Sequence, residues 1–223
     1  MKEVIAIDGP AASGKSTVAS RIAAALKIPY VNTGNMFRAV TRAAQAAGVR
    51  TPEACTEAAL KPVLAGLKMA YRRNADGVFD LEVNGEFPGA ALRAPEIAAL
   101  VSPVAAVGCV RTYLKELQRA FAEHGMLVME GRDIGTVIFP DAAWKFFVTA
   151  TPEERARRRL AQSGENFSGA TLEEVARGIA ERDRIDSERA IAPLKPAPDA
   201  EILDTTGRSI DEVVQHILDR VKV

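Results

Sequence analysis

Cysteine and histidine are scarce in this 223-residue chain, which contains two of each. Cys55 and Cys109 lie far apart, in apolar surroundings and without the spacing of metal ligands. We therefore expect two buried, reduced thiols in a cytoplasmic protein rather than a disulfide framework. His124 and His216 each stand alone, and we expect them to be surface residues rather than catalytic ones.

The chain also lacks a net charge and a long apolar run. Lys+Arg and Asp+Glu number 29 each, so no overall field favours nucleic acid or acidic lipid as a partner. The longest apolar stretch, residues 97–110, is broken by Ser102 and Pro103 and is too short to cross a bilayer. The first residues predict a strand rather than a signal peptide. We expect a cytoplasmic protein that binds neither membrane nor nucleic acid.

Apolar runs and helical patterns alternate along most of the chain. The predicted strands are Val4–Asp8, Pro29–Asn32, Met126–Glu130, Trp144–Thr149 and Ala200–Asp204. The predicted helices are Lys15–Leu26, Asn35–Ala47, Glu53–Leu67, Ala94–Ala106, Arg111–Glu123, Pro152–Gln162, Thr171–Ala190 and Ile210–Val221. Such alternation is typical of an α/β fold with a parallel sheet covered on both faces. The length of 223 residues, 48% of them hydrophobic, favours one large domain.

Two stretches break the alternation. Residues 68–85 alternate in polarity, turn at Asn74–Gly77, alternate again and turn at Asn84–Gly85, which predicts an antiparallel hairpin inserted into the parallel fold. Ser163–Gly169 is rich in Gly and Ser and lies between two charged helices, so we expect a mobile flap there.

A glycine-framed loop follows the first predicted strand. It has the pattern G-x-x-x-x-G-K-[ST], with Gly9, Gly14, Lys15 and Ser16 in the fixed positions, and it opens a predicted helix. Backbone N–H groups and the positive end of that helix would cradle phosphates. Lys15 would reach the β- and γ-phosphates, and the Ser16 hydroxyl would bind Mg²⁺.

Phosphate loops of this kind serve switches, motors and kinases. A GTP-binding switch normally carries an Asn-Lys-x-Asp motif, which is absent here. A motor usually has an apolar strand that ends in Asp-Glu, whereas the equivalent strand here, MLVME, continues into GRD. A small kinase is left, and it needs an acceptor pocket that faces the loop.

Arginines mark where that pocket is expected. Ligands of open α/β sheets bind at the carboxyl ends of the strands, and two predicted strands continue into NTGNMFR and EGRDIGT. Arg182, Asp186 and Arg189 are spaced to share one helix face. By themselves they would be a solvated ion-pair face. Together with the strand-end arginines they favour a second phosphate site, because guanidinium groups bind phosphate bidentately.

Four stretches occur in order along the chain: GPAASGKST, NTGNMFR, EGRDIGTVIFPDA and ERDRIDSERAIAPL. Together they resemble the bacterial cytidylate (CMP/dCMP) kinases, members of the nucleoside-monophosphate kinases, from about Val4 to Val214. The resemblance implies the P-loop nucleoside-monophosphate kinase fold: one domain over residues 1–223 with a five-stranded parallel sheet flanked by helices. It also implies an antiparallel acceptor-side insertion at 63–106 and a short lid at 153–172.

The activity implied by the resemblance is ATP-dependent phosphorylation of CMP and dCMP in pyrimidine nucleotide metabolism, with Mg²⁺ as cofactor of ATP. We expect the enzyme to be a monomer. One alternative is another P-loop small-molecule kinase, for example for UMP. Another is a nucleotide-binding regulatory module without turnover.

The resemblance also assigns residues to each substrate. ATP falls to Gly9, Pro10, Ala11, Ala12, Ser13, Gly14, Lys15, Ser16 and Thr17, with Mg²⁺ held through Ser16. The CMP phosphate is assigned to Thr33, Arg38, Arg132 and Arg189, and the base to Ser102, Arg111 and Asp133. The sugar is assigned to Arg182 and Asp186. The resemblance leaves open how Arg182, Asp186 and Arg189 divide the sugar and the phosphate between them. The catalytic residues implied are Lys15, Arg132, Arg182 and Arg189.

Simpler explanations compete at several positions. Ser102 would alternatively cap a helix, and Arg111 would alternatively be an exposed residue at a helix start. Arg155, Arg158 and Arg159 share a helix face, either as a solvated surface or with at least one of them over the transferring phosphoryl group. Asn32 and Glu130 stand where the family more often has Asp; neither change removes a residue assigned to a substrate.

Overall fold

The computed structural model describes residues 2–161 and 169–221. Its centre is a five-stranded sheet in the order β2-β5-β1-β6-β7, and every pairing in it is parallel. The strands are β1 (Lys2–Asp8), β2 (Tyr30–Asn32), β5 (Leu127–Gly131), β6 (Ala142–Thr149) and β7 (Glu201–Asp204). This confirms the α/β fold with a five-stranded parallel sheet. β6 begins at Ala142, two residues before the predicted start.

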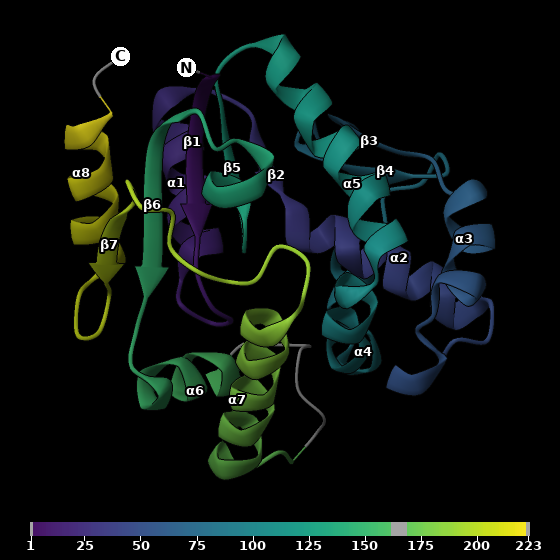
Figure 1. Cartoon of the computed structure of the whole chain (residues 1–223). Helices are drawn as coiled ribbons and strands as arrows, with labels where there is room; N and C mark the ends of the chain where they lie inside the picture. Colours follow the sequence, from purple (N-terminus) through teal and green to yellow (C-terminus); the bar gives the residue numbers. More distant parts are fainter. Residues whose placement is uncertain (1, 162–168, 222–223) are drawn as a thin grey trace.

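Helices cover both faces of the sheet (Figure 1). The helices of the described chain are α1 (Lys15–Leu26), α2 (Thr33–Ala46), α3 (Glu57–Ala65), α4 (Pro95–Ala106), α5 (Gly108–Phe121), α6 (Pro152–Ala161), α7 (Leu172–Glu188) and α8 (Ile210–Arg220). α1 and α8 pack on one face of the sheet, whereas α6 and α7 lie beyond the carboxyl ends of its strands (Figure 1). Shorter helical turns span Pro52–Ala54, Gly89–Arg93, Ala122–His124 and Ile134–Ile138. Side chains alternate across a strand, so β1 sends Ile5 and Ile7 into the α1–α8 layer and Val4 and Ala6 into the opposite layer. The buried strand explains the apolar run at the start of the chain.

The predicted helix Glu53–Leu67 is wrong, because the segment forms two separate elements. Pro52–Ala54 is a short 3-10 turn, and α3 starts only after Thr56. The Thr56 hydroxyl accepts a hydrogen bond from the backbone N–H of Ala59, so it caps the helix and fixes its start.

α4 and α5 follow each other almost without a break. They are separated at Val107, whose backbone is extended, and their axes differ by 94°. α5 therefore starts at Gly108 rather than at the predicted Arg111. Among the described residues no single helix is long and apolar enough to cross a membrane; this bent pair meets the requirement in length and composition only.

The predicted hairpin is confirmed, with β3 (Met69–Arg73) antiparallel to β4 (Phe79–Val83). Tyr71 of β3 packs against the rings of Phe79 and Phe121. Its hydroxyl donates to the carbonyl of Asn32 at 2.8 Å and accepts from the N–H of Asn32 at 3.1 Å. The phenol thus anchors the hairpin to the end of β2. The flap predicted at 163–169 lies, except for Gly169, outside the described residues.

Replacing Tyr71 with Phe should lower the free energy of unfolding by about 1–2 kcal/mol. The ring stays, while both partly buried backbone groups of Asn32 lose a partner. Urea denaturation measures the change, with Val78→Ala as control at an exposed position next to β4, where a change below about 0.5 kcal/mol is expected. Equal losses in the two variants would contradict the anchoring role.

Candidate functional site

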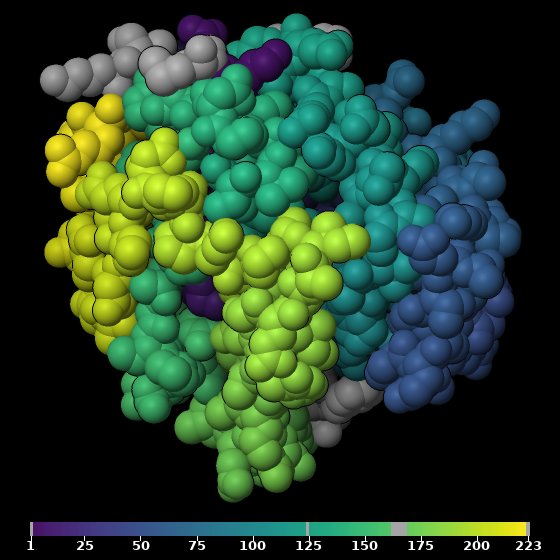
Figure 2. Space-filling view, in the orientation of Figure 1, coloured from purple at the N-terminus to yellow at the C-terminus, as the bar shows by residue number. Residues whose placement is uncertain are grey.

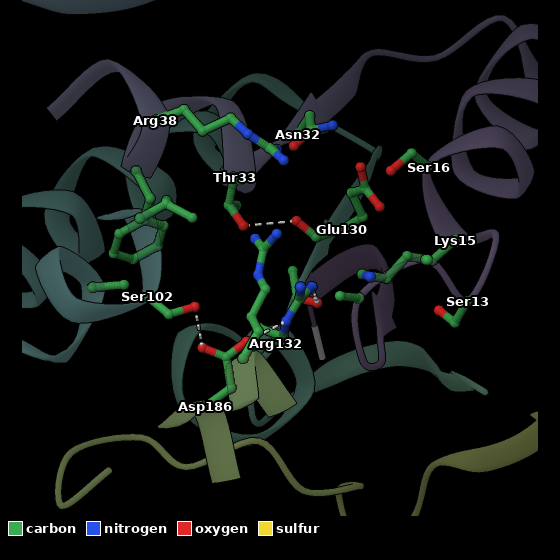
Figure 3. A pocket seen from close by; sticks show the side chains of 18 of the residues that line it. Ser13, Lys15, Ser16, Asn32, Thr33, Arg38, Ser102, Glu130, Arg132 and Asp186 are labelled. Atoms are coloured by element: carbon green, nitrogen blue, oxygen red, sulfur yellow. Dashed lines mark hydrogen bonds and ion pairs between the residues drawn. The ribbon is translucent and has the colours of Figure 1, made fainter. Parts of the chain in front are cut away.

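One cavity lies at the carboxyl ends of the strands and brings the predicted residues together (Figure 3). All nine predicted CMP-binding residues line it: Thr33, Arg38, Ser102, Arg111, Arg132, Asp133, Arg182, Asp186 and Arg189. Seven of the nine predicted ATP-binding residues also line it: Ala11, Ala12, Ser13, Gly14, Lys15, Ser16 and Thr17. Gly9 and Pro10 do not. In Figure 3 Lys15 enters from one side and Arg38 and Ser102 from the other, with Arg132 between them.

Gly9 allows the start of the phosphate loop to pass close to the backbone of β6. Its φ is +151°, and an added Cβ would lie 2.0 Å from the carbonyl oxygen of Val148 on β6, so no side chain fits. The loop then turns back on itself, and Lys15 donates from Nζ to the carbonyl of Pro10 at 2.7 Å. Burial holds the pKa of Lys15 well below its usual value, and the charge of Arg132 adds to this effect. A phosphate oxygen beside Lys15 would favour its charged form, because a nearby negative charge raises the pKa of a buried amine.

Helices α6 and α7 hold the loop backbone. Arg155 donates to the carbonyl of Ala11 at 3.2 Å and forms an ion pair with Asp183, which accepts from the N–H of Ala11 at 3.4 Å. Arg158 donates to the carbonyl of Ser13 at 3.3 Å. Figure 2 shows α7 across the front of the molecule, with the purple N-terminal segment visible in a small recess beside it.

Of the three lid-side arginines, only Arg159 lines the cavity. Burial, together with the charges of Arg38 and Arg132, lowers its pKa to about 10. Arg155 and Arg158 instead hold the carbonyls of the phosphate loop. The helical spacing correctly placed the three on one face but did not separate these roles.

Asp186 is the centre of the acceptor side. It accepts from Arg132 Nε at 2.9 Å and from the Ser102 hydroxyl at 3.2 Å, and Arg189 lies 3.6 Å away. The side chains of Asp186 and Arg189 are only 4% and 3% exposed. Arg189 follows the end of α7 at Glu188 rather than lying on the predicted helix, but both side chains are buried in the site, so the solvated ion-pair interpretation is wrong.

Charge keeps Asp186 ionised despite its burial. Burial by itself would raise the pKa of Asp186, but the charges of Arg132, Arg182 and Arg189 outweigh it and hold that pKa below its usual value. Arg182 is half-buried, and desolvation, with the charges of Arg132 and Arg38, lowers its pKa well below the usual value. Arg38 and Arg189 are each lowered to a pKa of about 10, mainly by burial.

Asp133 and Arg111 form a buried ion pair, and Arg189 lies 3.7 Å from the other oxygen of Asp133. Arg111 also donates to the carbonyl of Ala105 at 3.2 Å, and its guanidinium lies over the ring of Phe37, 5.4 Å from the centroid. The interpretation of Arg111 as an exposed residue is thus wrong. Ser102 lies inside α4, well after its start at Pro95, so it is not a cap either.

The two departures from the family pattern are both in the cavity wall. Asn32 caps α2 by accepting from the N–H of Asn35 at 3.1 Å. Glu130 accepts from the Tyr30 hydroxyl at 2.6 Å through Oε1, while its buried Oε2 has no hydrogen-bond partner among the described residues. Thr33 donates to the Glu130 carbonyl at 2.7 Å.

Sequence reasoning missed three residues that build this site: Asp8, Phe37 and Asp183. Asp8 ends the buried strand directly before the loop, and a polar residue at that position was an available signal. Phe37 lies one residue before Arg38 on α2, and Asp183 lies beside Arg182 on α7. Phe37 and Asp183 lie inside the stretches NTGNMFR and ERDRIDSERAIAPL, but the interpretation of these stretches rested on other residues, so the two were missed.

Comparison with known proteins places this geometry in a family. The sequence matches cytidylate kinase over residues 5–223. The chain belongs to the cytidylate kinase family. It is 45% identical over 217 residues to the cytidylate kinase of Geobacillus kaustophilus, which covers 97% of this chain and 95% of that protein. The family relationship supports the nucleotide kinase interpretation of the cavity.

A second cytidylate kinase relative is longer. The bifunctional pantoate ligase/cytidylate kinase of Prochlorococcus marinus is 43% identical over 221 residues, which cover 99% of this chain but 45% of that protein. The chain thus spans less than half of this relative. The crystal structure of an uncharacterized protein from Eubacterium ventriosum superposes over 98% of this chain and 97% of its own, with a TM-score of 0.54 at 13% identity, a likeness of fold alone.

Replacing Asp186 with Asn should lower the free energy of unfolding by about 3 kcal/mol at pH 7, because several buried cations lose their shared carboxylate. The native pKa of Asp186 lies below 3.8, so its stabilisation is present above about pH 4 and is lost as pH falls through the native pKa. Urea denaturation from pH 7 to pH 3 should therefore show a constant difference between the two proteins down to about pH 4, which starts to shrink only below that pH.

The matched control is Glu188→Gln on the same helix, which removes an exposed carboxylate paired with Arg184. Its effect should stay below about 1 kcal/mol. Similar losses for Asp186→Asn and Glu188→Gln would contradict the central role of Asp186.

Proposed function

We propose that this protein transfers the γ-phosphoryl group of ATP to CMP and dCMP, giving the diphosphates, as a step of pyrimidine nucleotide metabolism. The observation that carries the proposal is the buried group of Ser102, Arg111 and Asp133, which lines the same cavity as the phosphate loop. Membership of the cytidylate kinase family and the name of the relative from Geobacillus kaustophilus support it.

On the donor side, the loop from Gly9 to Thr17 holds the ATP phosphates. Its backbone N–H groups and the start of α1 face the cavity, and Lys15 carries the charge that meets the β- and γ-phosphates. Arg155 and Arg158 keep the loop in shape through its carbonyls. Arg159 is the lid-side arginine that contacts the transferring group, since it alone of the three lines the cavity.

The residues present fit Mg²⁺. The Ser16 hydroxyl lines the cavity, and Glu130 presents a buried carboxylate oxygen with no hydrogen-bond partner among the described residues. No group of three or more His, Cys, Asp or Glu side chains in the described part of the chain is arranged to hold a metal ion. Mg²⁺ in nucleotide kinases is typically held by one or two protein groups together with the substrate phosphates. When bound at Ser16, the ion neutralises charge on the β- and γ-phosphates.

On the acceptor side, Thr33, Arg38, Arg132 and Arg189 hold the phosphate of CMP, and Arg182 and Asp186 meet the sugar. Ser102, Arg111 and Asp133 recognise the base. Cytosine offers an N4 amine beside the N3 and O2 acceptors, which matches a carboxylate next to a guanidinium and a hydroxyl. Uracil has a carbonyl in place of the amine and would face Asp133 acceptor to acceptor.

The chemistry needs alignment and charge compensation more than proton transfer. Phosphoryl transfer passes through a loose transition state, and the acceptor phosphate oxygen is already anionic, so no general base is required. Lys15, Arg132, Arg182 and Arg189 surround the path between donor and acceptor and stabilise the charge that spreads over the transferring group. The insertion at 63–106, the lid at 153–172, the monomeric state and the cytoplasmic location stay predictions.

A panel of nucleoside monophosphates tests the function. ADP release from ATP should be fast with CMP and dCMP, at least about a hundredfold slower with UMP, and close to background with AMP, GMP or no acceptor. A coupled assay measures ADP. Release that is equally slow with every acceptor would make the protein a nucleotide-binding module without turnover, and a preference for UMP would reverse the assignment of the base site.

Replacing Asp133 with Asn should lower kcat/KM for CMP about a hundredfold and change that for UMP less than about threefold. The amide keeps the shape of the side chain, but it cannot accept from the N4 amine and pair with Arg111 through two oxygens at once. Steady-state kinetics with both nucleotides measure the change, and Asp141→Asn, at an exposed position, is the control. Equal losses for CMP and UMP would remove Asp133 from base recognition.

A further inference from the structure

Asp8 joins the phosphate-loop strand to the turn that follows Arg132 and Asp133. It is the last residue of β1, is 4% exposed, and directly precedes Gly9. Its Oδ1 accepts from the N–H of Ile134 and its Oδ2 from the N–H of Gly135, each at 2.8 Å. Both oxygens are thus engaged by consecutive backbone groups of one turn.

The turn has little room to move away from this carboxylate. It is the helical turn Ile134–Ile138, which begins directly after Asp133. An added Cβ at Gly135 would lie 3.2 Å from Cδ and 3.3 Å from Cγ of Lys145, and 3.5 Å from Oδ2 of Asp8. Gly135 therefore sits between the Lys145 stem on β6 and the Asp8 carboxylate, and the absence of a side chain lets the turn come this close.

We propose that Asp8 is a positioning residue that fixes Arg132 and Asp133 relative to the phosphate loop. The loop starts one residue after Asp8, and the acceptor-binding pair ends one residue before Ile134. Two hydrogen bonds of 2.8 Å therefore set the donor half and the acceptor half of the cavity in register. This inference rests on the proposed function, because it assigns Arg132 and Asp133 to CMP.

The burial, hydrogen bonds and neighbouring charges of Asp8 determine its pKa. Burial raises its pKa to about 7, against the N–H groups of Gly135 and Ile134, which lower it. Two charged groups act on it, Asp133 raising and Lys15 on α1 lowering the pKa, while the stem of Lys145 packs beside it from β6. Protonation turns one acceptor oxygen into a donor that opposes an N–H. The connection is therefore strongest above pH 7 and weakens as pH falls through that value.

The test replaces Asp8 with Asn, which keeps the shape and removes one acceptor. Isothermal titration measures Kd for CMP and for ATP at pH 6 and pH 8. At pH 8 the variant should bind CMP about tenfold more weakly than the unaltered protein, because one N–H is left facing an amide donor, while Kd for ATP stays within about twofold. At pH 6 the CMP ratio should approach one. Ionisation of the CMP phosphate affects both proteins alike and cancels in the ratio.

Asp204→Asn is the matched control. Asp204 ends β7 as Asp8 ends β1, is exposed, and accepts from the N–H of Thr206 at 2.8 Å outside the cavity. The Kd of the Asp204→Asn variant for CMP should stay within about twofold of that of the unaltered protein at both pH values. An Asp8→Asn ratio that does not change between pH 6 and pH 8, or an equal loss of ATP affinity, would reduce Asp8 to a general structural role and overturn the proposal.

Gly135→Ala tests the same connection with the carboxylate in place. The methyl group crowds Lys145 and Asp8, so CMP affinity should fall about threefold with ATP affinity unchanged. This variant decides the question if Asp8→Asn does not fold, and unchanged CMP affinity would then overturn the proposal.

Failure of the proposed function is recognised separately, as a protein that neither binds nor phosphorylates CMP. Amide hydrogen exchange of Ile134 and Gly135 then decides on Asp8. Faster exchange in Asp8→Asn than in Asp204→Asn supports the positioning role, and equal exchange overturns it.

Discussion

The structure depends on a concentration of buried positive charge at one edge of the sheet. Seven cationic side chains line the cavity against three carboxylates; the cations are Lys15, Arg38, Arg111, Arg132, Arg159, Arg182 and Arg189, and the carboxylates are Glu130, Asp133 and Asp186. Burying unpaired charge costs free energy, and the lowered pKa values of Lys15 and Arg182 reflect that cost. Phosphate groups of two nucleotides would supply the missing negative charge. The same excess that strains the free protein thus favours its substrates.

Sharing of carboxylates keeps this arrangement in place. Asp186 serves Arg132, Arg189 and the Ser102 hydroxyl, while Asp133 serves Arg111 and Arg189. Helix α7 also sends Asp183 to the phosphate loop. One helix therefore reaches both halves of the cavity, and a shift of α7 would act on donor and acceptor together.

The sheet and the hairpin were predictable because each repeats a pattern. The alternation of apolar runs and helices predicted five parallel strands, and Asn-Gly turns predicted β3 and β4. The segment after Pro52 was predicted as one helix, since its composition suits a helix throughout and the competing cap at Thr56 depends on a single hydroxyl. A single capping hydrogen bond of this kind can determine where a helix begins.

The candidate site was predictable in its members and less so in their contacts. The motifs and the family resemblance named nine acceptor-side residues, and all nine line the cavity. Arg155 and Arg158 contact the phosphate loop, whereas Arg159 lines the cavity. Helical spacing predicts that the three side chains share a face, but it does not predict which group each of them contacts. Asp8 belongs to no periodic pattern, and its partners Ile134 and Gly135 lie more than 120 residues further on.

The place of β1 has a consequence for synthesis on the ribosome. This strand is synthesised before the other strands of the sheet, yet it lies in the middle of the sheet between β5 and β6, which end at Gly131 and Thr149. Its apolar residues and its hydrogen-bonding edges lack their neighbours β5 and β6 until residues 127–149 have been synthesised. Pairing over such sequence distances is slow, and an unpaired apolar strand is prone to aggregate. The nascent chain is therefore most vulnerable before β6 is complete, a period in which chaperone protection matters most.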